Sequence, residues 1–291
     1  MIKRAGALAS LLLFATFSQF TANAAPQPER IALWNKRAPV GGGEFSTEET
    51  WITVHRAANP NGTAAIICPG GGYGGLVTGA EGHGIAKWLN GHGITGIVLE
   101  YRLPNGRSEV PLLDAQRAIR TARANAFKWK IKADRIGIIG FSAGGHLAST
   151  AGTHFDAGQS RAKDPVDRAS SRPDFMILVY PVVTMGVGTH GGSRTRLLGK
   201  DPSPALIKRF SNEQQVTKET SPAFLAHAVD DKPVPVAHSR NFFKALKAKG
   251  VPAKYLELPD GGHGLNRYQG PRWDAWQKQS LQWLAGLGLN D

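Results

Sequence analysis

A serine flanked by glycines is the position in this sequence best suited to covalent chemistry. Ser142 is the centre of a G-x-S-x-G pattern at residues 140–144. Residues 135–139 before it are a run of strand formers, and the small, helix-tolerant residues 145–150 after it favour a helix. In this context the pattern predicts a nucleophile elbow, a turn so tight that glycines are needed two residues before and two residues after the serine. The alternative is an ordinary glycine-rich turn between a strand and a helix.

A serine nucleophile needs a base within hydrogen-bonding distance, and the base needs an acid that orients it. In proteins with this elbow the chain order is Ser, then Asp or Glu, then His. His263 has the right place, because it lies in the glycine-rich stretch 260–264, after the apolar residues 255–258. We therefore predict that His263 is the general base. The alternative is a histidine of a turn that faces water.

Two adjacent aspartates compete for the role of the orienting acid. Asp230 and Asp231 follow the apolar residues 224–229. Neighbouring side chains point in opposite directions in extended backbone, so only one of the two can orient His263. We prefer Asp231 and keep Asp230 as the alternative. The other aspartate is expected to accept hydrogen bonds from N–H groups of the turn.

The negative charge that develops on a substrate oxygen needs donors that are already in position. One is expected to be the backbone N–H of Ala143, directly after the nucleophile. The other is expected from the glycine-rich residues 70–75, where Gly71 and Gly72 are the candidates. A loop that binds phosphate is the alternative, but no G-K-[ST] pattern follows it.

The remaining histidines and aromatic residues give weaker signals. His146 lies one helical turn after Ser142 and is expected to support the elbow, whereas His227 is expected in the core or behind the site. Tyr73 and Trp34 are candidates for sugar contacts, with simple packing as the alternative. The other histidines lack the spacing of metal ligands, so we predict no metal site and no cofactor.

Apolar stretches alternate with stretches of helical periodicity along the chain. The strand-like stretches are 51–55, 63–68, 94–99, 135–139, 175–180, 224–229 and 255–258, and the helical ones include 82–91, 111–127, 237–249 and 272–284. This alternation predicts an α/β fold, with a mostly parallel sheet covered by helices on both faces. Residues 184–220 interrupt it, with a short helix at 204–210, and are expected to form a small cap.

The first 24 residues have the features of a secretory signal peptide. A basic start at Lys3 and Arg4 precedes an apolar stretch at 5–17, and Ala22 and Ala24 form a small-x-small cleavage site. A retained membrane helix is the alternative. Cleavage would leave residues 25–291 as one domain, secreted or periplasmic, without a further apolar stretch of about 18 residues that could span a membrane. The single cysteine, Cys68, excludes an internal disulfide.

The chain carries a formal net charge of +13. The basic residues are spread along the sequence without a run of five or six, and no aromatic residues alternate with them. This distribution favours a basic surface over nucleic-acid binding. The positive charge could also recruit an acidic polysaccharide such as glucuronoxylan.

Four motifs together resemble the α/β-hydrolase superfamily. They are residues 69–73, 140–146, 230–235 and 261–264. Within the superfamily, the chain is similar to secreted bacterial esterases of the acetylxylan esterase and feruloyl-esterase-like kind. The likeness covers nearly all residues after 24. One departure is Pro69, which stands where many relatives have a histidine, and it weakens any transfer of their substrate specificity.

The resemblance implies a serine carboxylesterase that removes small acyl groups from O-acylated plant polysaccharides or oligosaccharides. Ser142, His263 and Asp231 would form the catalytic triad, and acetyl is the expected acyl group. Two other functions stay open. One is a serine peptidase of the oligopeptidase type, although such enzymes usually carry a large extra domain. The other is a carbohydrate-binding protein without catalysis on the same fold.

Overall fold

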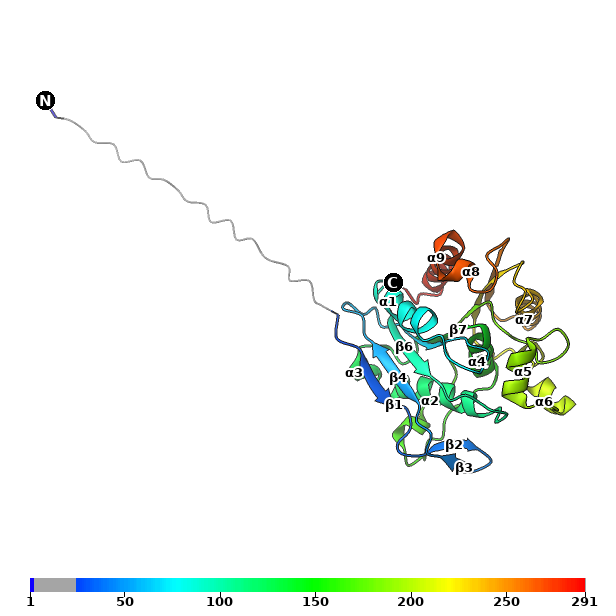
Figure 1. Cartoon of the computed structure of the whole chain (residues 1–291). Helices are drawn as coiled ribbons and strands as arrows, with labels where there is room; N and C mark the ends of the chain where they lie inside the picture. The colour runs from blue at the N-terminus through cyan, green and yellow to red at the C-terminus, as the bar shows by residue number, and fades with distance from the viewer. Residues whose placement is uncertain (3–24, 291) are drawn as a thin grey trace.

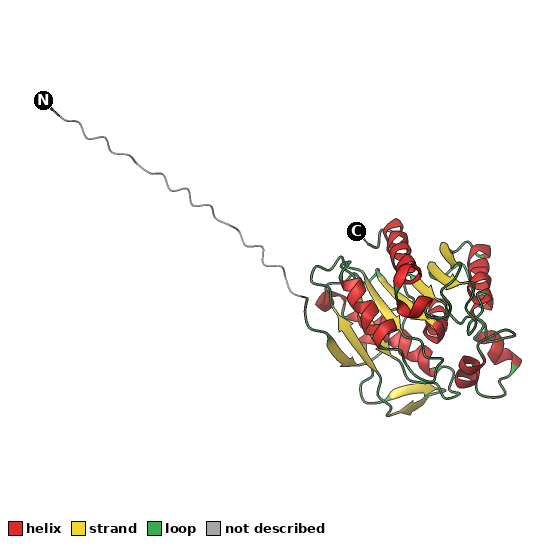
Figure 2. Ribbon diagram, turned by 45° about the horizontal axis from the view of Figure 1, so that its top comes forward, coloured by secondary structure: helices red, strands yellow, loops and turns green. Residues whose placement is uncertain are grey.

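The computed structural model describes residues 1–2 and 25–290 of the chain. Apart from its first two residues, the segment predicted as a signal peptide lies outside the described residues. An eight-stranded sheet forms the centre of the described part, and helices cover both of its faces (Figure 2). The predicted α/β fold class is therefore confirmed.

Six neighbouring strands of the sheet run parallel. At one edge a strand of opposite direction pairs with them, and an outermost strand pairs antiparallel with that one. In spatial order they are β1 (Glu29–Ala32), β4 (Trp51–His55), β6 (Thr95–Glu100), β5 (Ala64–Cys68), β7 (Ile136–Phe141), β8 (Met176–Val179), β9 (Ala223–Ala228) and β10 (Ala253–Leu258). A separate hairpin consists of β2 (Ala38–Gly41) and β3 (Glu44–Ser46). The central strands are buried on both faces, which explains their continuous apolar sequences.

Two apolar cores lie on the two faces of the sheet. Helices α2 (Val110–Ala124), α4 (Ser142–Thr153) and α7 (Ala237–Ala248) pack on one face, and α1 (Gly84–Asn90) and α9 (Gly270–Gly286) pack on the other. Successive strand residues alternate between the cores: in β5, Ile66 belongs to one core and Ile67 to the other. No helix within residues 1–2 and 25–290 has the length and apolar character needed to cross a membrane.

Shorter helices connect these elements. They are the π-helical turn η1 (Gly79–His83), α3 (Ala126–Trp129), the 3-10 turn η2 (Pro165–Arg168) and α8 (Leu265–Tyr268). Between β8 and β9 the chain forms α5 (Gly191–Leu198), α6 (Pro204–Arg209) and the 3-10 turn η3 (Asn212–Gln214). Helices α5 and α6 lie next to one another at one side of the molecule (Figure 1). The short helix expected at 204–210 corresponds to α6.

Candidate active site

Ser142 lies in a strained turn between β7 and α4. Its φ angle of +51° is in the left-handed region, which side chains other than glycine rarely adopt. A Cβ atom on Gly144 would lie 2.1 Å from the carbonyl oxygen of Cys68, and one on Gly140 would lie 2.2 Å from that of Gly144. Only glycine fits at these two positions, which accounts for the G-x-S-x-G pattern.

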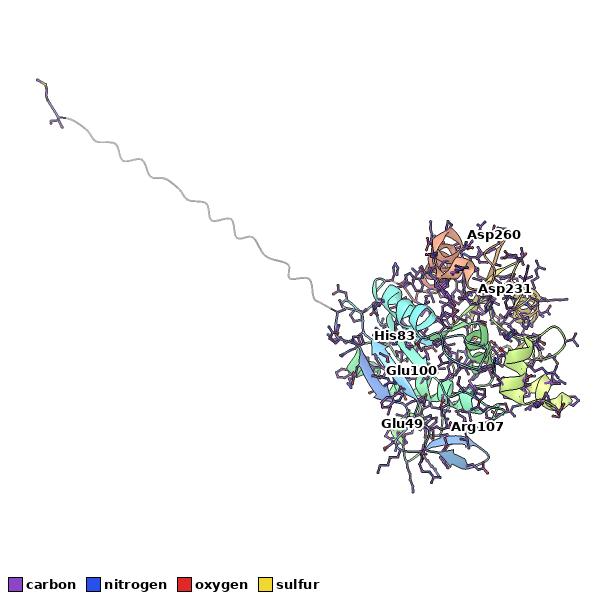
Figure 3. The ribbon with its side chains drawn as sticks, viewed as in Figure 1. Glu49, His83, Glu100, Arg107, Asp231 and Asp260 are labelled. Carbon is purple, nitrogen blue, oxygen red and sulfur yellow. The ribbon has the colours of Figure 1, made fainter. Side chains whose placement is uncertain are left out.

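The structure brings Ser142, His263 and Asp231 together, although they come from distant parts of the chain. The Ser142 hydroxyl lies 2.9 Å from His263 Nε2, and His263 Nδ1 lies 2.7 Å from Asp231 Oδ2. Each residue follows the carboxyl end of a strand, namely β7, β10 and β9, and these ends meet at one edge of the sheet. Figure 3 shows Asp231 well apart from Glu49 and Arg107, which lie towards the β2–β3 hairpin.

The Asp231 carboxylate is buried and accepts several hydrogen bonds. Its Oδ1 accepts from the backbone N–H of Val234 at 2.9 Å, and His227 Nε2 lies 3.2 Å from its Oδ2. Burial alone would raise the pKa of Asp231, but the hydrogen bonds from His227, His263 and Val234 together lower it to about 2. An ionised Asp231 only accepts, so the proton of neutral His263 lies on Nδ1 and leaves Nε2 free to accept from Ser142.

Asp230 accepts hydrogen bonds from other groups than Asp231 does. Its carboxylate accepts from the backbone N–H groups of Gly262 at 2.8 Å and Gly261 at 3.3 Å. These glycines belong to the loop that carries His263, so Asp230 fixes that loop while Asp231 contacts the imidazole. His227 lies behind Asp231, fully buried, as the sequence suggested.

The glycine-rich loop after β5 lies beside Ser142. Within residues 1–2 and 25–290, the backbone N–H groups of Gly71 and Gly72 have no protein acceptor, and both glycines line the same cavity as Ser142. The N–H of Ala143 belongs to the first turn of α4, where it has no partner within the helix. These groups are therefore available to a bound oxygen.

Glu81 is a residue of this site that the sequence analysis missed. Its side chain is buried beside Ser142, where Oε2 accepts from the backbone N–H of Gly70 at 2.6 Å and Oε1 accepts from the Tyr180 hydroxyl at 2.9 Å. The Tyr180 ring lies 4.8 Å from the His263 ring, centroid to centroid. Burial raises the pKa of Glu81, although these hydrogen bonds act in the opposite direction. Glu81 thus connects the glycine loop to the residue that packs on the imidazole.

The cavity in front of Ser142 has a volume of about 290 Å³. Gly71, Gly72, Glu81 and His263 line it, and so do His190 and Arg196 from the segment between β8 and β9. His190 and Arg196 were also missed, since nothing in their local sequence indicates where α5 lies. A larger open groove between α1 and α9 contains none of these residues.

The expectation that Tyr73 contacts a sugar is wrong. Tyr73 is only 1% exposed, and its hydroxyl lies 2.8 Å from His146 Nδ1. His146 Nε2 donates to the carbonyl oxygen of Phe210 at 2.8 Å, so Nδ1 accepts from Tyr73. Burial lowers the pKa of His146 to about 4 and keeps it neutral. Tyr73 and His146 therefore tie the glycine loop to α4 from behind. Trp34 lies away from this cavity, where its indole N–H donates to Asp114.

A metal ion has no evident site here. The described residues contain no cluster of three or more His, Cys, Asp or Glu side chains that could hold one. Cys68 is buried, and burial raises the pKa of its thiol.

Comparisons with known proteins show the family of this chain. The BD-FAE family model matches residues 57–246. An acetylxylan esterase from Xylanibacter ruminicola is 35% identical over 235 residues, which cover 79% of this chain and 45% of that protein. The chain thus spans about half the length, or less, of the curated relatives that it matches.

Solved structures of esterases are similar over nearly their whole length. An acetyl ester-xyloside bifunctional hydrolase from Caldicellulosiruptor lactoaceticus has 37% identity and a TM-score of 0.81, with 88% of this chain and 97% of that chain covered. A carboxylesterase from Lactobacillus plantarum has 25% identity and a TM-score of 0.73, with 91% and 99% covered. The predicted resemblance is confirmed: the chain belongs to the BD-FAE family and has the α/β-hydrolase fold.

Proposed function

We propose that this protein is a secreted serine carboxylesterase that removes small acyl groups, principally acetyl, from O-acylated plant polysaccharides or oligosaccharides. The observation that carries the proposal is the pair of hydrogen bonds, 2.9 Å and 2.7 Å long, that join Ser142 to His263 and His263 to Asp231. The names of the relatives, an acetylxylan esterase and an acetyl ester-xyloside hydrolase, support a carbohydrate ester as the substrate.

In the proposed reaction the Ser142 oxygen attacks the ester carbonyl carbon while His263 Nε2 takes the serine proton. The tetrahedral intermediate then collapses. The bond to the sugar oxygen breaks, and His263 returns the proton to that oxygen, which leaves as a hydroxyl group. The acyl group stays on Ser142 until water, activated by His263, releases it as the free acid.

Backbone donors stabilise the oxyanion of both tetrahedral intermediates in this mechanism. The N–H of Ala143 supplies one hydrogen bond, and the N–H of Gly71 or Gly72 supplies another. Each such donor contributes about 3 kcal/mol to lowering the barrier, because the donor is in place before the charge forms. Asp231 stabilises the charged imidazole that exists between the two proton transfers.

A small acyl group suits the cavity. Its volume of about 290 Å³ is at the low end for ligand pockets. Export of the protein rests on the sequence of residues 1–24 alone, and N-terminal sequencing of protein from the culture medium or periplasm would test it.

The test of the function is acetate release from acetylated xylan and from simple sugar acetates, compared with ferulate release from feruloylated xylan. Acetate release from the carbohydrate substrates is the expected result. A fluorophosphonate probe should label Ser142 in parallel. Absence of labelling would favour a binding protein without catalysis, and faster cleavage of amides than of esters would favour a peptidase.

A further inference from the structure

Arg196 reaches the candidate active site from α5. Its Nη1 donates to the carbonyl oxygen of Gly72 at 3.1 Å. A Cβ atom added to Gly74 would lie 2.7 Å from its Nε and 2.8 Å from its Cζ, so the guanidinium rests on the glycine loop. Arg196 lines the same cavity as Ser142 and is exposed to solvent.

The guanidinium has unused donors at this place. Arginine has five N–H donors, and one of them is used on Gly72. In the part of the chain that the structure describes, Arg196 forms no ion pair. Arg209 of the neighbouring helix α6, in contrast, pairs with Glu109 at 3.0 Å. Among the described residues, a positive charge that forms no ion pair therefore lies at the wall of a cavity that Glu81 also lines.

His190 adds a second donor beside Arg196. Its Nδ1 accepts from the backbone N–H of Ser193 at 3.2 Å, which caps α5, so the proton of the neutral ring is on Nε2. A Cβ atom on Gly192 would lie 3.2 Å from Arg196 Nη1 and 3.3 Å from His190 Cε1, which shows that the two side chains are neighbours. Both line the cavity.

We propose that Arg196 and His190 form an anion subsite that binds the carboxylate of a uronic acid group carried by the acylated substrate. The planar guanidinium matches the two oxygens of a carboxylate, and charge-assisted hydrogen bonds are stronger than neutral ones. The subsite rests on the proposed function, because its ligand is an acidic sugar of the acylated carbohydrate that the esterase would cleave. It gives that function a substrate class: acylated glucuronoxylan fragments.

The test compares two substrates that differ only in the carboxylate. One is an acetylated xylo-oligosaccharide with a glucuronic acid side group, and the other is the same compound with this acid converted to its primary amide. For the unmodified protein we expect KM to be about fivefold lower for the acid, the size of a partly exposed charge pair. High salt should reduce this preference because it screens exposed charges.

The Arg196→Gln variant should lose the preference, and Arg196→Lys should keep part of it. Arg194→Gln is the matched control, because Arg194 lies on the same helix but does not line the cavity. It should keep the full preference. If Arg196→Gln lowered kcat equally for acid and amide but kept the KM preference, Arg196 would only support the glycine loop, and the proposal would be overturned.

Failure of the subsite and failure of the proposed function give different results. If the protein hydrolyses both oligosaccharides with equal KM, the esterase function stands and the subsite is refuted. If it hydrolyses neither, nor 4-nitrophenyl acetate, the proposed function is refuted. Titration calorimetry of the acid and the amide with the Ser142→Ala variant tests the subsite without turnover, and equal affinities there would again refute it.

Discussion

The two walls of the cavity at Ser142 are built in different ways. The core wall consists of Glu81, Ser142 and His263, which are mostly buried. Ser142 is hydrogen-bonded to His263, and behind the wall Gly70 and Tyr180 donate to Glu81. The segment wall consists of His190 and Arg196 on α5, and Arg196 is exposed. A change in the core wall must therefore disturb several buried hydrogen bonds, whereas a change in Arg196 removes one exposed hydrogen bond, to Gly72.

This difference suggests a division of labour in the proposed enzyme. The core wall holds groups whose positions must be accurate to a fraction of an ångström for proton transfer and oxyanion binding. The segment wall is hydrogen-bonded to the glycine loop only through Arg196 and Gly72 among the described residues, so it is better suited to substrate selection. Substitutions in the core wall should lower turnover on every ester, and those in the segment wall should alter the choice among esters.

The largest effect is expected from Ser142→Ala. Loss of the nucleophile should lower kcat on 4-nitrophenyl acetate by about 10⁵-fold or more, because the remaining groups act only on bound substrate and water. Removing one hydroxyl from the strained turn should leave the unfolding temperature nearly unchanged. Activity within tenfold of the parent protein would show that another residue attacks the ester.

The next largest fall in kcat is expected from Asp231→Asn. An amide NH₂ group facing His263 Nδ1 would favour the tautomer with its proton on Nε2, which cannot accept from Ser142, and kcat should fall by about 10⁴-fold. Asp230→Asn is the matched control, because Asp230 contacts only the loop backbone. It should lower kcat by less than tenfold. A larger fall in kcat for Asp230→Asn than for Asp231→Asn would contradict the assignment of Asp231.

The difference in stability between the parent protein and Asp231→Asn should depend on pH. The pKa of Asp231 is lowered from 3.8 to about 2 in the folded protein, so its ionisation stabilises the fold above pH 4 by about 2 kcal/mol. This stabilisation is lost as the pH falls from about 4 to 2. The difference in unfolding free energy between parent and Asp231→Asn should therefore shrink over that range, as urea titrations at each pH can measure.

Gly144→Ala should mainly lower stability. The added Cβ would lie 2.1 Å from the carbonyl oxygen of Cys68 and 2.4 Å from that of Pro69, and neither backbone atom can move away easily. We expect a loss of about 3 kcal/mol or more in unfolding free energy. Gly191→Ala at the start of α5 is the control, since no heavy atom lies within 4 Å of its Cβ position. Its stability should change by less than about 1 kcal/mol. Equal stabilities for the two variants would contradict the close packing of Gly144 in the turn after Ser142.

The serine, aspartate and histidine of the site could be predicted from the sequence, because their signals are local. Ser142, Asp231 and His263 each follow an apolar strand, and the chain order of their residue types is diagnostic. The sequence offers no physical reason to choose Asp231 over Asp230 as the acid that contacts His263. Which of the two makes this contact depends on how the turn after β9 is oriented.

Other parts depend on tertiary contacts that have no local signature. Glu81 meets Gly70 from 11 residues away and Tyr180 from 99 residues away, so its burial is set by the packing of η1 against two loops. Tyr73 was misjudged for the same reason: an aromatic ring beside glycines looks accessible in sequence, but α4 and His146 cover it. The short strands β1 to β3 were missed because their pairing partners, not their composition, define them.

The smallest of these effects is expected from replacing Glu81. It is also the effect that best tests the comparison of the core wall with the segment wall. Glu81→Ala removes the acceptor of the Gly70 N–H and of the Tyr180 hydroxyl, and two buried donors lose their partners. The glycine loop should then hold its oxyanion donors less accurately, and kcat should fall by about 10- to 100-fold with little change in KM. Steady-state kinetics on 4-nitrophenyl acetate would measure both constants.

Glu81→Gln separates the positioning role from the charge of the carboxylate. The glutamine oxygen can accept from Gly70, and its NH₂ group can donate to the Tyr180 oxygen, because a hydroxyl can reverse its role whereas a backbone N–H cannot. This variant should therefore keep kcat within about threefold of the parent protein. If it instead lost as much activity as Glu81→Ala, the negative charge would matter more than the hydrogen bonds. If both variants raised KM and left kcat unchanged, Glu81 would contact substrate, and the core wall would share in substrate selection.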